Sequence, residues 1–328
     1  MKTVYFRDPT KENIEAAAKI IQDGGLLAIP TETVYGLGAD ALNEDAVLRI
    51  FLAKGRPQDN PLIIHVPDSS WLARYCEDVP PEAYALAEKF WPGPLTMILP
   101  RKPIVPLRTT GGLETVGVRC PNHPITRAVI AAADVPIAAP SGNTSGRPSP
   151  TCIADMIEDM DGRIEGMFDG GPCAVGVEST IIDLTCTPPR LLRPGGLPLE
   201  ALEAVLGHVE VDKAVVSLLK DGERPKAPVT VVTGDPEASA RYIQTHLPEG
   251  AGVICFTEYK DLFPGRSIHD LGPAADKAEQ ARRVFDALRE FDHEAVTEIY
   301  AQCPDTAGLG LAVANRLKKA AGFHVIEV

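Results

Sequence analysis

The sequence predicts an α/β protein with two domains: a first domain built on a mixed, twisted sheet with flanking helices, and a smaller, doubly wound second domain. Three observations support this prediction. The chain has 328 residues, of which 45% are hydrophobic, and this is enough for about two domains. Short apolar runs and amphipathic segments follow one another along most of the chain. A polar, proline-bearing stretch at 220–228 separates two different patterns of these segments.

The helices of the first domain are predicted from amphipathic segments and their stop signals. The segment 13–23 is one example, because Gly24 and Gly25 follow it and glycine commonly ends a helix. Further helices are expected at 44–54, 81–90, 125–133, from near Ile153, and at 199–206.

The strands of the first domain are predicted from short apolar runs. They are expected at 26–30, 62–66, 95–99, 116–120, 135–139, 166–168, 179–184 and 190–192. Because these runs do not alternate strictly with the helices, a purely parallel sheet is not expected. The order favours a mixed sheet with helices packed against it.

The second domain is predicted from a more regular alternation. Strands are expected at 229–232, 252–256, 296–301 and 324–328, and helices at 236–246, 275–291 and 309–321. This alternation is typical of a small doubly wound α/β domain. The expected division is therefore 1–207 for the first domain, 208–228 for a linker and 229–328 for the second domain.

Composition argues against several classes of protein. The net charge is −13, and residues 1–207 carry −8, from 18 Lys and Arg against 26 Asp and Glu. Strong direct binding of nucleic acid is not expected, because such proteins are usually basic. Without a run of about 20 apolar residues or an apolar signal core, neither a membrane span nor secretion is expected. Seven scattered cysteines without a Cys-x-x-Cys pair predict a reduced, cytoplasmic protein with no zinc ribbon or disulfide framework.

A polar loop, PSGNTSGRPSPT at 140–151, follows the apolar run at 135–139 and precedes a predicted helix. Small hydroxylated residues between a strand and a helix can surround phosphate oxygens with N–H groups and hydroxyls. The loop matches neither the Walker A pattern nor the dinucleotide-binding glycine pattern. A solvated turn is the alternative interpretation.

Two further polar segments adjoin predicted strands. In PTETVYGLG (30–38), hydroxyls, an acid and a phenol follow a strand, which is typical of a small polar pocket or of a turn with capping threonines. In KGRPQDNPLIIH (54–65), Lys54 and Arg56 flank a glycine and suit a polyphosphate, although a solvated loop is the alternative. Polar residues at strand ends of α/β sheets converge on a ligand crevice.

Cations at other strand ends extend this set. Arg119 follows an apolar strand and, if buried, needs a partner, which is either a substrate carboxylate or an internal acid. The inventory combines neutral donors with Lys54, Arg56, Arg119, Arg147 and Arg193. Such a site can orient anionic groups and stabilise developing charge without a covalent nucleophile. These properties favour phosphoryl or nucleotidyl transfer.

Seven segments in a fixed order resemble the YrdC/Sua5 family, the L-threonylcarbamoyladenylate synthases. They are PTETVYGLG (30–38), KGRPQDNPLIIH (54–65), WPGPLT (91–96), VGVRCP (116–121), AAPSGNTSGRPSPT (138–151), VEST (177–180) and LRPG (192–195). The additional domain after a linker resembles the longer, two-domain Sua5 form. The resemblance implies a YrdC-like first domain and a Rossmann-like C-terminal domain.

The resemblance also implies a reaction: L-threonine, bicarbonate and ATP give threonylcarbamoyl-AMP and pyrophosphate. The product then serves N6-threonylcarbamoyladenosine (t6A37) modification of tRNA, through separate threonylcarbamoyl-transfer proteins. A carbamate formed on threonine would attack the α-phosphorus of ATP in line. The substrate supplies the nucleophile, so the protein needs only to orient the reactants and neutralise charge.

By position, the resemblance implies roles for twelve residues. The residues implied for L-threonine are Thr33, His65, Arg119, Ala139 and Ser179. Of these, Arg119 would take the carboxylate and Ala139 would offer a backbone contact. The residues implied for ATP are Arg56, Asn60, Thr115, Ser141, Ser149 and Arg193. The catalytic residues implied are Lys54 and Arg56, with Lys54 near the phosphates.

Two expectations concern a cofactor and the linker. A Mg²⁺ ion held mainly by the ATP phosphates is implied, and no protein metal site is predicted, since His65 has no second ligand at metal spacing. Sua5 proteins usually carry a Lys-Tyr-x-His-Tyr segment in the linker, which folds over the site as a lid. Here RPKAP at 224–228 runs directly into Val229 without it. Either the pocket closes differently or a piece of the linker is missing, and the flanking Pro-Lys-Ala-Pro favours the second explanation.

Three rival functions are weighed against this one. An RNA-binding module is disfavoured by the charge of −8 on residues 1–207. Carbamoyl transfer in hydrogenase maturation requires acylphosphatase-like and zinc-finger segments, which the scattered cysteines do not provide. A sensor of threonine or nucleotide would bind both ligands and release no pyrophosphate.

Overall fold

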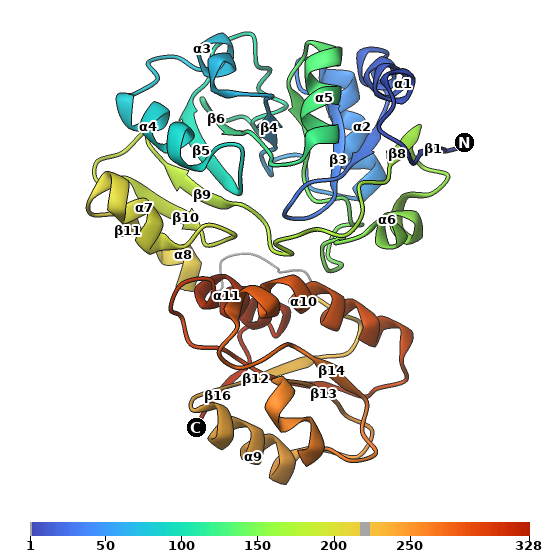
Figure 1. The fold of residues 1–328 in the computed structure, drawn as a ribbon, viewed down its shortest axis with the longest axis vertical. Helices are drawn as coiled ribbons and strands as arrows, with labels where there is room; N and C mark the ends of the chain where they lie inside the picture. Colours follow the sequence, from blue (N-terminus) through green and yellow to red (C-terminus); the bar gives the residue numbers. More distant parts are fainter. Residues whose placement is uncertain (1, 217–223) are drawn as a thin grey trace.

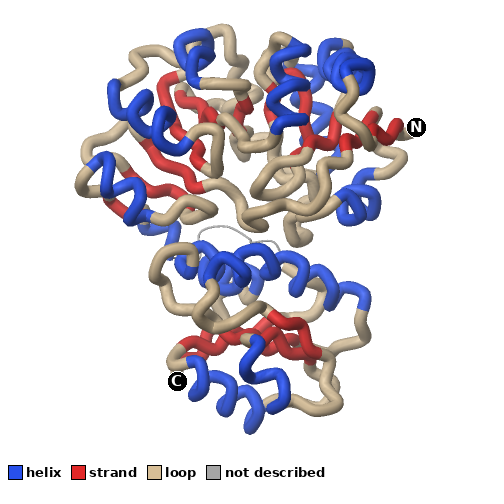
Figure 2. The backbone as a smooth tube through the Cα atoms, viewed as in Figure 1, coloured by secondary structure: helices blue, strands red, loops and turns tan. Residues whose placement is uncertain are grey.

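The computed structural model describes residues 2–216 and 224–328, which we call the N-terminal region and the C-terminal region. Each region is built around one sheet, and the two sheets lie one above the other with helices between them (Figures 1 and 2). The N-terminal sheet has the strand order β1-β8-β2-β3-β7-β4-β6-β5-β9-β10-β11. The C-terminal sheet has the order β14-β13-β15-β12-β16.

The elements of the N-terminal region have the following bounds. Its strands are β1 (Val4–Phe6), β2 (Leu27–Ile29), β3 (Gly36–Asp40), β4 (Ile63–His65), β5 (Leu95–Pro100), β6 (Thr115–Arg119), β7 (Ile137–Ala138), β8 (Gly166–Phe168), β9 (Thr180–Asp183), β10 (Arg190–Arg193) and β11 (Glu210–Val211). Its helices are α1 (Lys11–Gln22), α2 (Glu44–Lys54), α3 (Leu72–Tyr75), α4 (Pro81–Phe90), α5 (Pro124–Ala133), α6 (Ile153–Met160), α7 (Leu199–Leu206) and α8 (Lys213–Val216), with a 3-10 turn, η1, at Ser69–Trp71.

The elements of the C-terminal region have the bounds given next. Its strands are β12 (Val229–Thr233), β13 (Gly252–Cys255), β14 (Ile268–Asp270), β15 (Ile299–Gln302) and β16 (Val325–Glu327). Its helices are α9 (Pro236–His246), α10 (Lys277–Glu290) and α11 (Gly310–Ala320), with 3-10 turns η2 (Thr257–Leu262) and η3 (Phe291–His293). None of the helices in the described ranges of either region combines the length and the apolar character that a membrane crossing needs.

The predicted fold class is confirmed in both regions. The N-terminal sheet is mixed, since β4 and β6 run parallel whereas β5 and β6 run antiparallel. The recorded strand pairs of the C-terminal sheet are all parallel. In Figure 1, α9 covers one face of this sheet, and α10 and α11 cover the other, as in a doubly wound domain. The predicted helices 44–54, 81–90 and 199–206 coincide with α2, α4 and α7.

Strand β3 was not expected from the sequence, because glycine is rare in strands and two of its five residues are Gly36 and Gly38. The structure shows why glycine is needed. A Cβ on Gly38 would lie 2.8 Å from Cγ2 of Ile137 and 3.2 Å from the carbonyl oxygen of Leu27. The strand therefore fits between its neighbours only when this position carries no side chain.

Residues 210–216, expected to lie in the linker, form β11 and α8. β11 extends the N-terminal sheet, with Arg190 of β10 opposite Glu210. After the gap, the backbone N–H of Arg224 donates to the carbonyl of Gly146 at 2.8 Å, so the described chain resumes beside the 140–151 loop. Residues 217–223, which belong to the predicted linker, lie outside the described residues.

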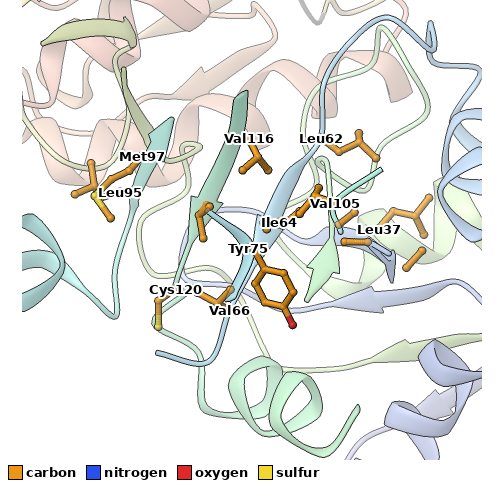
Figure 3. Packing of buried hydrophobic residues seen from close by; sticks show 14 of the residues in the cluster. Leu37, Leu62, Ile64, Val66, Tyr75, Leu95, Met97, Val105, Val116 and Cys120 are labelled. Atoms are coloured by element: carbon orange, nitrogen blue, oxygen red, sulfur yellow. The ribbon is translucent and has the colours of Figure 1, made fainter. Parts of the chain in front are cut away.

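The core of the N-terminal region consists of two apolar clusters, and neighbouring residues of β2 such as Leu27 and Ala28 belong to different ones. In one of them, Leu37, Ile64 and Met97 come from three different strands and are fully buried, and Figure 3 shows them in the cluster that also holds Tyr75. Burial of each such aliphatic side chain stabilises the fold by about 1.5–3 kcal/mol. This packing holds the neighbouring strands in register, and the register positions the polar residues described below.

The two regions share an apolar cluster. Val34 and Val177 of the N-terminal region pack with core residues of the C-terminal region such as Val284 and Phe285. Figure 1 shows α10 and α11 facing the N-terminal region. The approach is close, because a Cβ on Gly176 would lie 2.4 Å from the Cα of Arg282 on α10. The loops that precede β9 are therefore fixed by both regions.

Candidate active site

Strand register brings three polar side chains into one row. His65 ends β4 and is opposite Arg119, which ends β6, and Arg119 is in turn opposite Thr96 of β5. Side chains at directly opposite positions share one face of a sheet. An imidazole, a guanidinium and a hydroxyl therefore lie side by side within a buried part of the sheet. Thr96 lies in the WPGPLT segment and was not among the predicted site residues.

Arg119 has an internal acidic partner. Its Nη2 lies 2.8 Å from Oε2 of Glu32, and its Nε donates to the carbonyl of Gly93 at 3.4 Å. Arg119 is 4% exposed and Glu32 is 7% exposed, so the pair is largely removed from water. The sequence left open whether the partner is a substrate carboxylate or an internal acid, and in this structure it is Glu32.

Glu32 is held by its own surroundings and was not among the predicted site residues. Its Oε2 also accepts the backbone N–H of Asn122 at 3.1 Å, while Oε1 is buried without a hydrogen-bond partner within the described residues. The turn that presents it is fixed by Thr31, whose Oγ1 accepts the N–H groups of Thr33 and Val34. An acid in a turn with capping threonines is the only signal that marked it.

His65 is neutral in this environment. Burial, together with the neighbouring Arg119 guanidinium, lowers the pKa of His65 from its ordinary 6.5 to about 3. Nδ1 lies 3.2 Å from the carbonyl oxygen of Ile137, and a carbonyl only accepts, so Nδ1 carries the proton. Nε2 is then a hydrogen-bond acceptor, which suits a substrate hydroxyl or ammonium.

Two more of the residues implied for threonine lie in the same buried area. Thr33 is fully buried, and its Oγ1 lies 2.9 Å from Oγ1 of Thr31. The N–H of Ala139 donates to the carbonyl of Ile63 at 3.0 Å as part of the sheet. A backbone contact from Ala139 to a ligand would therefore use its carbonyl oxygen.

Ser179 connects the residues implied for threonine with those implied for ATP. Its Oγ lies 2.8 Å from Oγ1 of Thr96 and accepts Nη2 of Arg193 at 3.1 Å. Nε of Arg193 donates to the Ser179 carbonyl at 3.0 Å. Arg193 at the end of β10 is therefore oriented by the residue that adjoins the His65–Arg119–Thr96 row.

Lys54 joins helix α2 to the 140–151 loop. It is the last residue of α2 and is 2% exposed, and its Nζ contacts the carbonyls of Ser141 and Asn143. The chain can turn sharply after Lys54 because Gly55 adopts a left-handed conformation with φ of 65°. The Lys54 carbonyl accepts the N–H of Ser145 at 2.8 Å. The ammonium thus shapes the loop that was predicted to surround phosphates.

The 140–151 loop is pinned at both ends. Ser141 is paired with Gly36 in an antiparallel bridge, and the carbonyl of Pro150 accepts the N–H of Tyr35 at 2.9 Å. Ser149 is 1% exposed and Ser141 is half-buried. Both hydroxyls therefore belong to a segment that β3 holds against the sheet.

Arg147, like Arg119, has internal acidic partners. Its guanidinium contacts Asp159, and its Nη2 lies 2.8 Å from Glu158, both on helix α6. It was expected to help attract anionic groups, but α6 supplies its counter-charges. The loop itself contains no acid, so this pairing could not be inferred from the loop sequence.

The remaining residues implied for ATP lie at the opposite end of the strands. Asn60 precedes β4 and Thr115 begins β6, whereas His65 and Arg119 end these strands. Thr115 and Arg119 are four residues apart on one strand, about 13 Å. Arg56, which is partly exposed, donates from Nη2 to the carbonyl of Pro61 at 3.3 Å. The residues implied for the two substrates are therefore spread along the strands and not gathered at one end.

The described residues contain no group of three or more His, Cys, Asp or Glu side chains arranged to hold a metal ion. All seven cysteines are free, and burial raises the pKa of those at Cys76, Cys120 and Cys255. Within residues 2–216 and 224–328, no such cluster offers a cage to a divalent cation. An ion carried by a polyphosphate would fit this donor set of hydroxyls, carbonyls and cations.

Comparisons with known proteins match both regions. The Sua5/YciO/YrdC family model, described as "Telomere recombination", matches residues 19–195. The model of the "Threonylcarbamoyl-AMP synthase, C-terminal domain" matches residues 224–322.

Full-length relatives share this organisation. The threonylcarbamoyl-AMP synthase of Pyrococcus abyssi is 47% identical, with 96% of each chain covered. That of Bacillus subtilis is 44% identical, with 100% of each chain covered. The crystal structure of P. abyssi Sua5 complexed with L-threonine superposes with a TM-score of 0.94, at 44% identity and with 100% of each chain covered.

Proposed function

This chain belongs to the Sua5/YciO/YrdC family and makes threonylcarbamoyl-AMP, and we propose that it does so from L-threonine, bicarbonate and ATP, with release of pyrophosphate. The observation that carries the proposal is the buried row of His65, Arg119 and Thr96, which adjoins Arg193 through Ser179. This arrangement would offer charged and hydrogen-bonding groups to a small polar substrate and, next to them, a cation to a nucleotide.

The threonine half of the site is the buried row with the segments around it. We assign the threonine carboxylate to Arg119 and place Thr33, His65, Ala139 and Ser179 around the rest of the substrate. Because Arg119 already contacts Glu32, the threonine carboxylate would share the Arg119 guanidinium with Glu32. Neutral His65 would accept a hydrogen bond at Nε2 without repelling the cationic ammonium.

The nucleotide half extends from Ser179 towards the opposite strand ends. We assign ATP to Arg56, Asn60, Thr115, Ser141, Ser149 and Arg193, with Lys54 and Arg56 as the catalytic cations. The span of about 13 Å along β6 suits an extended nucleotide beside a small amino acid. A Mg²⁺ ion bound by the triphosphate would neutralise part of its charge, with the 140–151 loop offering hydroxyl and carbonyl oxygens.

The chemistry needs no protein nucleophile. The threonine ammonium first loses a proton to solvent. The neutral nitrogen then bonds to the carbon of CO₂ and releases a second proton, or bonds to the carbon of bicarbonate as its C–O bond breaks and water leaves, and either route gives a carbamate. A carbamate oxygen then attacks the α-phosphorus, and the bond from that phosphorus to the bridging oxygen of pyrophosphate breaks. Lys54, Arg56 and Arg193 would stabilise the charge that develops on the phosphoryl oxygens.

The wider role follows from the product. We propose that threonylcarbamoyl-AMP passes to proteins that transfer the threonylcarbamoyl group to tRNA, giving t6A37. A cytoplasmic location and weak direct contact with nucleic acid are part of the same proposal, and the net charge of −13 supports the second.

Pyrophosphate release by the purified full chain tests the proposal. We expect release only when L-threonine, bicarbonate and ATP are present together, and threonylcarbamoyl-AMP should be detected by mass spectrometry. A chain that binds ATP and threonine yet releases no pyrophosphate with all three reactants would contradict the proposal and favour a ligand sensor.

A further inference from the structure

We propose that Arg316 of the C-terminal region and Glu178 of the N-terminal region act together as positioning residues for Arg193, so that the C-terminal region completes the nucleotide half of the active site. The inference rests on the proposed function for its account of what Arg193 binds. It assigns a role in ATP binding to a helix, α11, that carries none of the predicted site residues.

Arg316 lies on α11 and is buried against the N-terminal region, with 5% of the residue exposed. Its Nε donates to Oε2 of Glu178 at 2.6 Å, and its Nη2 donates to the carbonyl of Pro194 at 3.0 Å. Its Nη1 donates to Oδ1 of Asn315 at 2.8 Å. The guanidinium therefore binds two separate N-terminal segments at once.

These two segments are the ones that carry site residues. Glu178 directly precedes Ser179, and Pro194 directly follows Arg193. The segments also touch each other, because a Cβ on Gly195 would lie 2.2 Å from the carbonyl oxygen of Glu178. One arginine from the C-terminal region thus holds these two segments together, next to the apolar packing of Val177 against the same region.

Glu178 stands between two guanidinium groups. Its Oε2 accepts Nε of Arg316, and its Oε1 lies 3.9 Å from Nη1 of Arg193. Burial alone would raise the pKa of Glu178, but Arg316 and then Arg193 lower it to about 2, so the carboxylate stays charged. A charged Glu178 attracts both arginines and sets the distance between them.

Arg193 is consequently fixed on two sides. Nε and Nη2 are held by the carbonyl and hydroxyl of Ser179, and Nη1 faces Glu178. Removal of Arg316 would leave Glu178 to interact with Arg193 alone, which would draw the guanidinium towards the carboxylate and away from an anionic ligand. A buried acid shared by two cations is therefore a means of keeping Arg193 available to ATP.

The second large interdomain contact has a different character. Arg289 on α10 donates to Asp159 at 3.0 Å and to the carbonyl of Pro148 at 2.7 Å, and its Nη1 donates to Glu158 at 3.2 Å. Its acidic partners Glu158 and Asp159 lie on helix α6, and both also pair with Arg147, which is not among the residues implied for a substrate. Arg316 differs from Arg289 because its acidic partner, Glu178, faces Arg193, which is implied for ATP.

The test combines three variants, Arg316→Gln, Glu178→Gln and the double variant, in the full chain. For Arg316→Gln we expect the KM for ATP to rise about tenfold, as for the loss of one charged contact, with the KM for threonine changed less than about twofold. Arg316→Lys should recover part of the ATP affinity. Because the two residues act together, the double variant should be no worse than the poorer single variant.

The matched control is Arg241→Gln on α9, whose guanidinium pairs with Glu237 at 2.8 Å on the exposed surface. It should leave both KM values unchanged. Melting temperatures are measured in parallel, and assays are run well below the lowest one, so that loss of fold is not mistaken for loss of affinity.

Two results would overturn the inference. One is an unchanged KM for ATP in Arg316→Gln. The other is an equal rise in the KM values for ATP and threonine, which would indicate a purely structural role. Titration calorimetry with ATP separates this inference from the proposed function. If wild-type protein binds ATP but releases no pyrophosphate, the function fails, whereas the effect of Arg316→Gln on ATP affinity still decides the role of Arg316.

Discussion

The two halves of the site are stabilised in different ways. The threonine half lies within a sheet, where the register of β4, β6 and β5 determines which side chains meet. The nucleotide half consists of loops and strand ends held by Lys54, by Ser179 and, across the region boundary, by Arg316. A site defined by register changes only when the fold does, whereas one defined by loop contacts can change residue by residue.

The largest expected effect lies in the threonine half. Arg119→Ala would leave buried Glu32 without its cation, and breaking a buried ion pair costs about 3–5 kcal/mol. We expect the free energy of unfolding, measured by urea denaturation, to fall by that amount. Threonine-dependent pyrophosphate release should be lost, with a sharply raised KM for threonine where activity persists.

A control for this change is Arg74→Ala, which removes an exposed pair with Asp134 at 3.2 Å. It should alter stability by less than about 1 kcal/mol. If Arg119→Ala does not fold, Arg119→Lys can be used instead. It keeps a cation beside Glu32 and still removes bidentate binding of a carboxylate. Threonine dependence equal to that of the wild type in the folded variant would exclude Arg119 from its assigned role.

A smaller effect is expected from the nucleotide half. Arg56→Ala should weaken the use of ATP by roughly 1.5–3 kcal/mol if the guanidinium makes a charge-assisted bond to the nucleotide. Steady-state pyrophosphate release at saturating threonine should show this as a higher KM for ATP. Arg108→Ala is a matched control, because Arg108 is nearby and pairs with Glu44 at 3.6 Å. An equal effect of both substitutions would show that general surface charge, not Arg56, matters.

A substitution that disturbs backbone packing in the nucleotide half should have an effect of comparable size. Gly195→Ala would place a Cβ 2.2 Å from the Glu178 carbonyl, so the turn carrying Arg193 must shift. Overpacking of this kind costs about 1–3 kcal/mol. We expect lower stability and a raised KM for ATP. Gly265→Ala, where a Cβ meets no atom within 4 Å, should leave the KM for ATP unchanged. A normal KM in Gly195→Ala would mean that the turn is not needed for ATP.

The smallest expected effect is on how stability depends on pH, where the two halves should respond in different pH ranges. The folded state keeps His65 neutral, with a pKa of about 3 against an ordinary 6.5, so the unfolded chain binds more protons in that window. Stability should therefore fall as the pH drops below 6.5, by about 1.4 kcal/mol at pH 5.5. Denaturation at pH 7 and pH 5.5 measures this, and His65→Gln should reduce the difference, leaving the part due to His123, whose pKa burial also lowers.

The nucleotide half should respond only at lower pH. Glu178 has its pKa lowered from 4.5 to about 2, so the stability it contributes is present above pH 4.5 and is lost as the pH falls towards 2. A Glu178→Gln variant should differ from the wild type in its acid denaturation below pH 4.5 and not between pH 7 and 5.5. Loss of both contributions at the same pH would contradict the separation of the halves.

Local patterns predicted most elements because the signals were local. Helix α2 begins after the capping residue Asn43 and ends at Gly55, and both signals are adjacent to the helix in sequence. The glycines of β3 argued locally against a strand. Glycine is needed there because neighbours such as Ile137, far away in the chain, leave no room for a side chain. The sequence therefore predicted strands and helices well wherever tertiary packing agreed with local propensity.

Site residues followed the same rule. Resemblance located the residues. In the structure His65 and Arg119 are opposite each other in the sheet, Ser179 adjoins them through Thr96, and Thr33 directly follows Glu32, the partner of Arg119. The partners of the charged residues were not predictable, since Glu32, Glu178 and Asp159 are distant in sequence from the arginines they contact. An ion pair depends on where two segments meet, which a single sequence does not reveal. The ligand contacts of all twelve residues remain predictions.

The short strand β11 has a consequence for anyone who divides this chain. It lies along β10 and covers the outer edge of the N-terminal sheet, with Leu191 opposite Val211. A fragment ending at Gly207 would expose unpaired N–H and C=O groups along β10, and such an edge can recruit a strand from another molecule. A fragment that keeps residues through 216 retains this cover. The cut site would thus decide whether the isolated fragment stays monodisperse or self-associates.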